Sequence, residues 1–169
     1  DCRAYAHALG RADEMLDEHG GTHVLALRPR QIQLLRGLEV LRCLSLTPKG
    51  LLRWYAGCCG APLANTPRNP RVAHVGMIHT CISSSREAMV RSFGDVRLQG
   101  FVREATSRPP KLARRRARAL IGFTASLVHA RLIGSYRRNP FFDANGNPVA
   151  VPRVLSAAQL ERARAGLAA

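Results

Sequence analysis

The strongest constraint on the fold is a pattern between residues 22 and 103, where short runs rich in Leu, Val and Ile alternate with proline, glycine and turn sequences. Apolar runs bounded in this way are typical of successive antiparallel strands. The interruptions include Pro29, Gly37 and Thr47-Pro48-Lys49-Gly50. We therefore expect strands over residues 22–27, 31–35, 38–46, 51–55, 71–82 and 96–103.

Helices are expected before and between these strands. Residues 12–19 are predicted to form a short helix, because Asp13 and Glu14 lie in its first turn, where the helix dipole favours negative charge. Gly20 and Gly21 would end it. Residues 84–93 are expected to form a helix or a turn between the last two strands.

The composition changes after Ser107-Arg108-Pro109-Pro110. Residues 111–136 have helical spacing. Their apolar residues on one side of that helix are Leu112, Leu120, Phe123, Leu127 and Ala130. A turn is expected at Asn145 and Gly146, and Ser156 with Gln159 resembles a capping box that begins a final helix through Leu167.

Length and composition indicate one globular domain with extensions, because 169 residues with 46% hydrophobic content can bury a core. The expected fold class is mainly β (α+β), with antiparallel strands followed by a C-terminal helical extension. We divide the chain into a β domain over residues 1–106 and a basic helical extension over residues 107–169.

The chain is strongly basic, with a formal net charge of +15. Excess positive charge attracts phosphate-rich partners. Only Lys49 and Lys111 are lysines, so arginine makes up 24 of the 26 basic residues, a bias that GC-rich coding alone can produce. One cluster without an acidic residue opens the expected helix, where positive charge opposes the helix dipole. Its members are Arg108, Lys111, Arg114, Arg115, Arg116 and Arg118.

The five cysteines are odd in number and irregularly spaced, which does not suggest a disulfide framework and favours a reducing, cytoplasmic location. The longest apolar run, residues 119–128, has ten residues, whereas a membrane span needs roughly 20. No transmembrane helix is therefore predicted. Cys43 and Cys81 lie in apolar strands and are expected to belong to the core.

Cys58 and Cys59 are adjacent and precede Gly60-Ala61-Pro62. Two cysteines on one tight turn supply half of a tetrahedral zinc site. A zinc knuckle usually separates its cysteines by two residues, and neighbouring sulfurs reach one metal only with backbone strain. Spacing alone therefore favours a buried structural pair over a metal site.

The sequence Arg53-Trp54-Tyr55-Ala56-Gly57-Cys58-Cys59-Gly60-Ala61-Pro62-Leu63 resembles the family of glutathione-dependent formaldehyde-activating enzymes and centromere protein V. That family's knuckle reads aromatic, Cys, two residues, Cys, Gly, small, Pro. Cys59 matches the second cysteine, whereas Ala56 stands at the first. The opening residues Asp1-Cys2-Arg3-Ala4-Tyr5-Ala6 are similar to the end of the family's Cys-x-Cys-x-x-Cys loop and its following helix.

The resemblance implies a β-tent zinc-binding fold, and covers the first third of the chain well and the strands to Arg103 loosely. It implies Cys2, Cys58 and Cys59 as metal ligands, with Cys2 the last of three cysteines around a labile zinc and the earlier ones upstream of residue 1. Together with Asn139-Pro140-Phe141-Phe142-Asp143, the segment Thr47 to Tyr55 looks like an uncharacterised bacterial branch. The implied activity is that of a carbon-sulfur lyase acting on adducts of a small aldehyde with glutathione or another thiol.

Two other functions stay open. The basic cluster favours a non-enzymatic module that binds nucleic acid or an anionic membrane surface with strong salt dependence. Alternatively, the domain keeps only the fold and contacts a neighbouring subunit through Leu120, Phe123 and Leu127.

Overall fold

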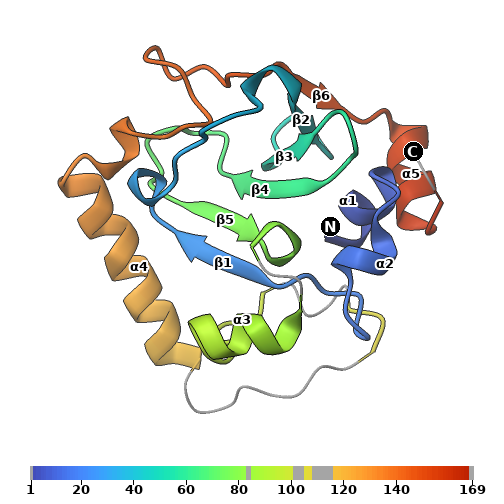
Figure 1. The fold of residues 1–169 in the computed structure, drawn as a ribbon, viewed down its shortest axis with the longest axis horizontal. Coiled ribbons are helices and arrows are strands. Elements are labelled where there is room, and N and C mark those ends of the chain that lie inside the picture. Colours follow the sequence, from blue (N-terminus) through green and yellow to red (C-terminus); the bar gives the residue numbers. More distant parts are fainter. Residues whose placement is uncertain (1, 83–84, 101–104, 108–115, 168–169) are drawn as a thin grey trace.

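The computed structural model describes residues 2–82, 85–100, 105–107 and 116–167 (Figure 1). Its helices are α1 (Cys2–Ala8), α2 (Ala12–Met15), α3 (Arg86–Phe93), α4 (Arg116–Leu132) and α5 (Ala157–Arg164). Its strands are β1 (Val24–Leu27), β2 (Leu41–Ser45), β3 (Leu52–Ala56), β4 (Pro62–Thr66), β5 (Val75–Ile78) and β6 (Pro152–Val154). Short 3-10 turns are η1 (Pro29–Gln31), η2 (Leu38–Val40), η3 (His79–Cys81) and η5 (Ser135–Arg137).

One six-stranded sheet forms the centre of the molecule, in the order β1-β5-β4-β3-β2-β6. Every pairing is antiparallel except that of β6, which lies parallel to β2 with Leu44 opposite Arg153. With its helices, this sheet makes the protein an α+β fold, mainly β, and confirms the expected fold class. Figure 1 shows α1, α2 and α5 together on one side of the view and α4 on the other.

Successive side chains of a strand point to opposite faces of a sheet. In this sheet, a cluster of buried apolar side chains covers each face. Trp54 lies opposite Cys43 in the β2–β3 register, and both residues belong to the first core cluster. That cluster consists of Leu41, Cys43, Leu52, Trp54, Ala64, Val75, Phe141 and Phe142. The second cluster packs the helices α1, α2 and α5 on the other face and consists of Ala4, Tyr5, Ala6, Met15, Leu44, Leu46, Ile78, Leu155 and Ala163.

Four predicted strands are confirmed: β1, β2 and β5 are shorter than expected, and β3 keeps its length but is shifted by one residue. The strand predicted over residues 31–35 is wrong: Pro29 begins the 3-10 turn η1, and Ile32 and Leu34 pack against the first cluster from a loop. The alternation of apolar and polar residues in this segment arises because Ile32 and Leu34 contact the core, and not because the segment pairs as a strand. The strand predicted over residues 96–103 is also absent from its described part, residues 96–100, where Val96 and Leu98 are exposed.

The helix predicted over residues 12–19 begins at Ala12 as expected but ends at Met15. The carboxylate of Asp17 accepts hydrogen bonds from the backbone N–H groups of His19 (2.9 Å) and Gly21 (2.7 Å). Aspartate stabilises a turn in this way in competition with the helix. The loop at 17–21 therefore replaces the last predicted turn.

The last helix, α5, begins at the residue that the sequence predicts. In α5, Ser156 Oγ accepts a hydrogen bond from Gln159 N, and Gln159 Oε1 accepts one from Ser156 N, which confirms the capping box. The helix ends at Arg164, three residues short of the prediction. The expected turn at Asn145 and Gly146 is also present.

The long basic helix is only partly described. The part that the structure describes runs from Arg116 to Leu132, and Gly134 in the left-handed region follows it. Ala130 is buried and Phe123 and Leu127 are half-buried, as predicted, whereas Leu120 is 51% exposed and does not share that face. Leu112 and the residues 108–115 lie outside the described residues.

The segment after residue 106 contributes to the same sheet and cores. It supplies β6 to the sheet edge, Phe141 and Phe142 to the first cluster, and Leu155 and Ala163 to the second. The division at residue 106 stays a prediction. Among the described helices, none combines the length and the apolar character needed to cross a membrane.

Candidate functional site

The cysteine pair lies on the tight turn that joins β3 to β4. Gly60 N donates to Ala56 O (2.8 Å) and Ala56 N donates to Ala61 O (2.9 Å), which closes the turn. Gly60 has a φ of +71°, a backbone conformation that glycine adopts without strain. Cys58 and Cys59 are both exposed and free. A buried structural pair is therefore wrong, and the two thiols are accessible from solvent.

This turn rests on the connection between α1 and α2. The Arg11 guanidinium donates a hydrogen bond to the carbonyl oxygen of Cys59. A Cβ at Gly60 would lie 3.3 Å from the carbonyl oxygen of Leu9. The cysteine turn is thus packed against the segment that directly follows the helix carrying Cys2.

Cys2 lies in the first turn of α1, half-buried and free. The helix is fixed to the sheet by Tyr5, whose hydroxyl donates to Trp54 O (3.1 Å). Burial raises the pKa of Tyr5 well above its usual value. The Arg53 guanidinium lies 5.1 Å from the centre of the Tyr5 ring and donates to Asn65 Oδ1 (3.4 Å). Cys2 therefore lies on a helix that is hydrogen-bonded to the sheet.

The other two cysteines differ in their surroundings. Cys43 is 2% exposed in the first cluster, which confirms it as a core residue, and burial raises its pKa to about 11. Cys81 was expected in the core but is exposed, because the chain leaves the sheet at Ile78 and turns through η3. Its Sγ lies 2.9 Å from Ile78 O and 3.3 Å from Leu63 O, and the partial burial of this thiol raises its pKa to about 11.

The histidines contact different parts of the fold. His74 meets the ring of Phe123 edge-on, with ring centres 5.2 Å apart, and burial lowers its pKa. His79 and His23 form a perpendicular pair with ring centres 5.7 Å apart. Across the described part of the chain, no three His, Cys, Asp or Glu side chains form a group that could hold a metal ion. The metal role of Cys2, Cys58 and Cys59 stays a prediction.

One hollow was not predicted from the sequence. A pocket of about 370 Å³ lies between α1, the loop after α2 and the end of α5. Its polar lining includes Arg3, His7, Asp17 and Arg164, and Arg3 Nη2 donates to Arg164 O (3.3 Å). These residues are up to 161 positions apart, so no local motif marks the pocket.

The fold and the cysteine turn together define an α+β protein with a solvent-exposed dithiol between two antiparallel strands. Residues 1–152 match a family of unknown function (DUF6151), and the chain belongs to this family. No curated protein and no solved structure matches the chain.

Proposed function

We propose that this chain is a zinc-binding protein related to the glutathione-dependent formaldehyde-activating enzymes, in an uncharacterised bacterial branch. The observation that supports the proposal most directly is the exposed pair Cys58 and Cys59, held on a turn that packs against residues 9–11. Cys2 begins the helix before that segment. In the proposal, Cys59 with Cys58 supplies thiolates to a structural zinc on this turn, and Cys2 supplies a thiolate to a separate, more labile zinc.

The chemistry of such a site is thiol-adduct chemistry. Bound zinc would polarise a carbonyl or stabilise a thiolate. The chain itself would hold the thiolates in place through the hydrogen bond from Arg11 to the cysteine turn and the attachment of α1 by Tyr5. A carbon-sulfur lyase that acts on an adduct of an aldehyde with glutathione or another thiol fits this set of donors. The cysteines of the chain are free, which favours a cytoplasmic location.

Zinc content per chain tests the proposal. The longest natural form of the protein is purified under reducing conditions, and its metal is measured by mass spectrometry for the wild type, Cys58→Ser, Cys59→Ser and Cys81→Ser. We expect Cys59→Ser to lose at least half of the zinc, because a thiolate ligand is removed. Cys81→Ser is the matched control, since Cys81 is exposed but hydrogen-bonded to backbone carbonyls. Unchanged zinc in Cys59→Ser would remove that residue from the site.

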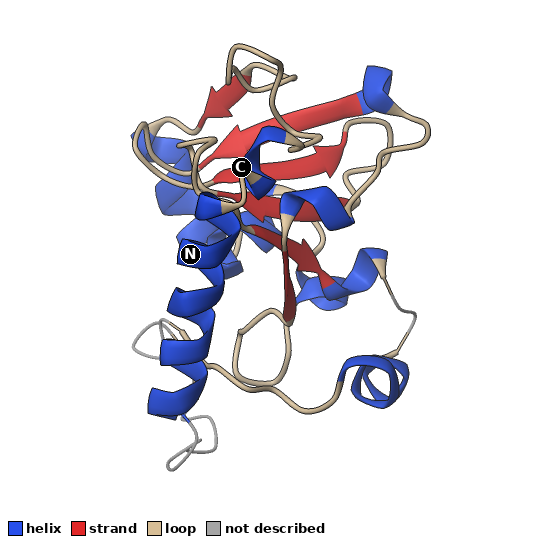
Figure 2. Cartoon of the chain, turned by 90° about the vertical axis from the view of Figure 1, so that its left-hand side faces the viewer, coloured by secondary structure: helices blue, strands red, loops and turns tan. Residues whose placement is uncertain are grey.

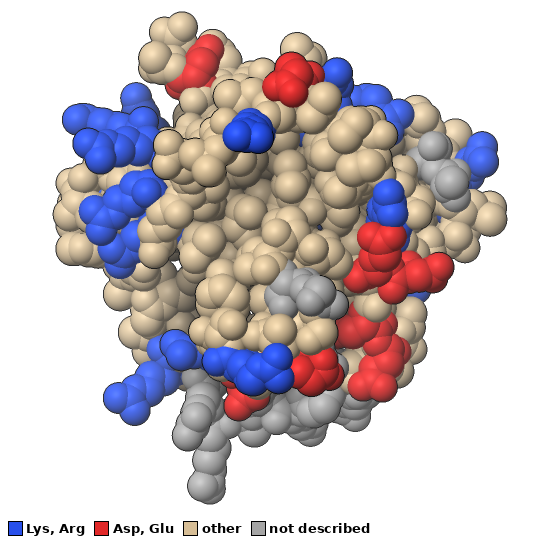
Figure 3. Space-filling model, viewed as in Figure 1, with Lys and Arg blue, Asp and Glu red and all other residues tan. Residues whose placement is uncertain are grey.

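A second candidate is a non-enzymatic module that binds nucleic acid or an anionic membrane. The distribution of charge favours it. Figure 3 shows a group of acidic side chains on the α2 side of the view and a group of basic side chains on the α4 side, with further charges of both signs at the top and bottom. Of the predicted basic cluster, Arg118 is exposed on α4, whereas Arg108, Lys111, Arg114 and Arg115 lie outside the described residues. A salt series with duplex DNA and with anionic vesicles tests this candidate, which salt-insensitive or absent binding would exclude.

A further inference from the structure

Helix α4 packs on the body of the protein through one side. The ring of Phe123 contacts His74, and Ser126 Oγ accepts a hydrogen bond from Arg28 Nη2 (3.3 Å). Ala130 on the same side is fully buried. These contacts fix which side of the helix faces inward.

The opposite side of α4 is apolar and exposed to solvent. Ile121 is 69% exposed, Val128 55% and Leu132 80%. Their spacing of seven and four residues places them along one line of the helix, about half a turn away from Phe123. Ala117 and Ala125 are exposed on the same line. We call these five residues the outer stripe.

A helix on the surface of a monomeric protein normally carries polar side chains on its outer face. Here the inner face and the outer stripe are both apolar, which is typical of a helix that is covered on both sides. Figure 2 views the molecule from the α4 side and shows this helix running along the outside of the chain. A contiguous exposed apolar surface of this kind indicates an interaction site.

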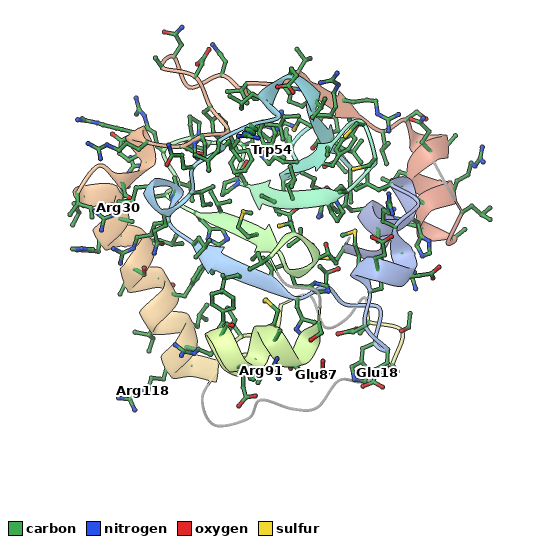
Figure 4. The ribbon with its side chains drawn as sticks, in the orientation of Figure 1. Glu18, Arg30, Trp54, Glu87, Arg91 and Arg118 are labelled. Atoms are coloured by element: carbon green, nitrogen blue, oxygen red, sulfur yellow. The ribbon has the colours of Figure 1, made fainter. Side chains whose placement is uncertain are left out.

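The charges beside the outer stripe indicate the kind of partner. Arg118 and Arg131 are exposed on its two flanks, and Arg131 Nη1 also donates a hydrogen bond to Arg71 O (3.3 Å). Figure 4 shows Arg118 projecting away from the body at one end of α4. From residue 105 to residue 142 the sequence has no acidic residue. The basic residues in this range whose side chains the structure describes are Arg118, Arg131, Arg137 and Arg138, all of them exposed.

We propose that α4 binds the surface of an anionic phospholipid membrane, with the outer stripe in contact with the acyl chains and the flanking arginines on lipid phosphates. This inference rests on the second candidate function, a module that binds nucleic acid or an anionic membrane, and selects the membrane as the partner. It does not depend on the zinc site. Apolar side chains flanked by arginine are the features of a helix that lies in the membrane interface. A second copy of this chain fits less well, because pairing two such faces brings like charges together. Nucleic acid fits less well too, because Ile, Val and Leu do not contact phosphates.

Co-sedimentation with vesicles tests this proposal. The chain is mixed with vesicles of phosphatidylcholine alone and of phosphatidylcholine with phosphatidylglycerol, at low and at high salt. We expect binding to the anionic vesicles only, and we expect Ile121→Gln/Val128→Gln/Leu132→Gln to weaken it at least about tenfold. The control Leu35→Gln/Val151→Gln changes two residues that are 79% and 92% exposed elsewhere, and it should bind like the wild type. Circular dichroism checks that each variant is folded.

The outcomes separate the proposal from its alternatives. Arg118→Glu should also weaken binding to anionic vesicles, and by less at high salt, because it reverses a screened charge. Binding that the triple variant keeps would leave the electrostatic candidate standing and overturn the role of the outer stripe. Absence of vesicle binding, binding to duplex DNA alone, or a dimer in solution that the triple variant dissociates would each overturn the membrane proposal.

Discussion

Phe141→Ala is expected to destabilise the whole sheet, although residue 141 lies far beyond the predicted boundary at residue 106. The Phe141 side chain is fully buried, and its ring centre lies 4.9 Å from that of Trp54 on β3. Figure 4 shows Trp54 in the interior, between the strands and the C-terminal segment. If this contact closes the first core cluster, removing the ring leaves a cavity against the centre of the sheet.

The magnitude follows from the burial of the ring. Replacing a fully buried phenylalanine by alanine costs about 3–5 kcal/mol of unfolding free energy, which includes the lost contact with Trp54. Domains of ordinary stability have about 5–15 kcal/mol in total. We therefore expect Phe141→Ala to lose a large fraction of its stability and to unfold at a clearly lower urea concentration.

Trp54 is the single tryptophan of the chain, so its fluorescence reports the sheet core directly during urea unfolding. The matched control is Phe93→Ala on α3, where the side chain is 42% exposed and the expected change is below about 1 kcal/mol. A loss below about 1 kcal/mol in Phe141→Ala would refute the reasoning. A Trp54 transition that the substitution leaves unchanged would do the same, and would support an independently folding domain over residues 1–106.

Two further predictions concern titration and thiol reactivity. Burial lowers the pKa of His74 below its usual 6.5, so the folded protein resists its protonation, and stability should be fullest above about pH 6.5 and fall at lower pH. His74→Gln should flatten this dependence in melting temperatures between pH 7 and pH 5, and an equal slope in both proteins would contradict it. Iodoacetamide at pH 8 should modify Cys58 and Cys59 first, because they are exposed, and Cys81 more slowly, because its pKa is about 11. Peptide mass spectrometry gives the order, and equal rates at Cys81 and Cys58 would contradict the structure.

Local signals in the sequence predicted much of the fold. The turn at Thr47-Pro48-Lys49-Gly50 separates β2 from β3, and Ser156 with Gln159 begins α5. Such signals act over a few residues and are therefore readable from one sequence. Strand β4 was missed, because Pro62 opens it and Asn65 and Thr66 end it, so it lacks a continuous apolar run. The loop around Ile32 and Leu34 was mistaken for a strand, because core contact alone produced its alternation.

The candidate site was predictable only where it is local. The adjacent cysteines and the glycine after them marked the β3–β4 turn, and their exposure follows from that turn. The contact of the turn with Arg11 depends on the path of the chain, and so does the pocket between α1 and α5. The outer stripe was hidden for a different reason: α4 is apolar on two sides, and the sequence does not show which side packs inward.

Phe141 and β6 follow strands β1 to β5 in the chain, and this order has a consequence for biosynthesis. Because a ribosome makes the chain from its first residue onward, the apolar side of β2 and β3 is completed before the segment that shields it has been translated. Until that segment is made, the nascent chain exposes apolar side chains and an unpaired edge of β2, a condition that favours aggregation and recruits chaperones. Translation of residues 141–154 therefore decides whether the earlier strands yield a stable product.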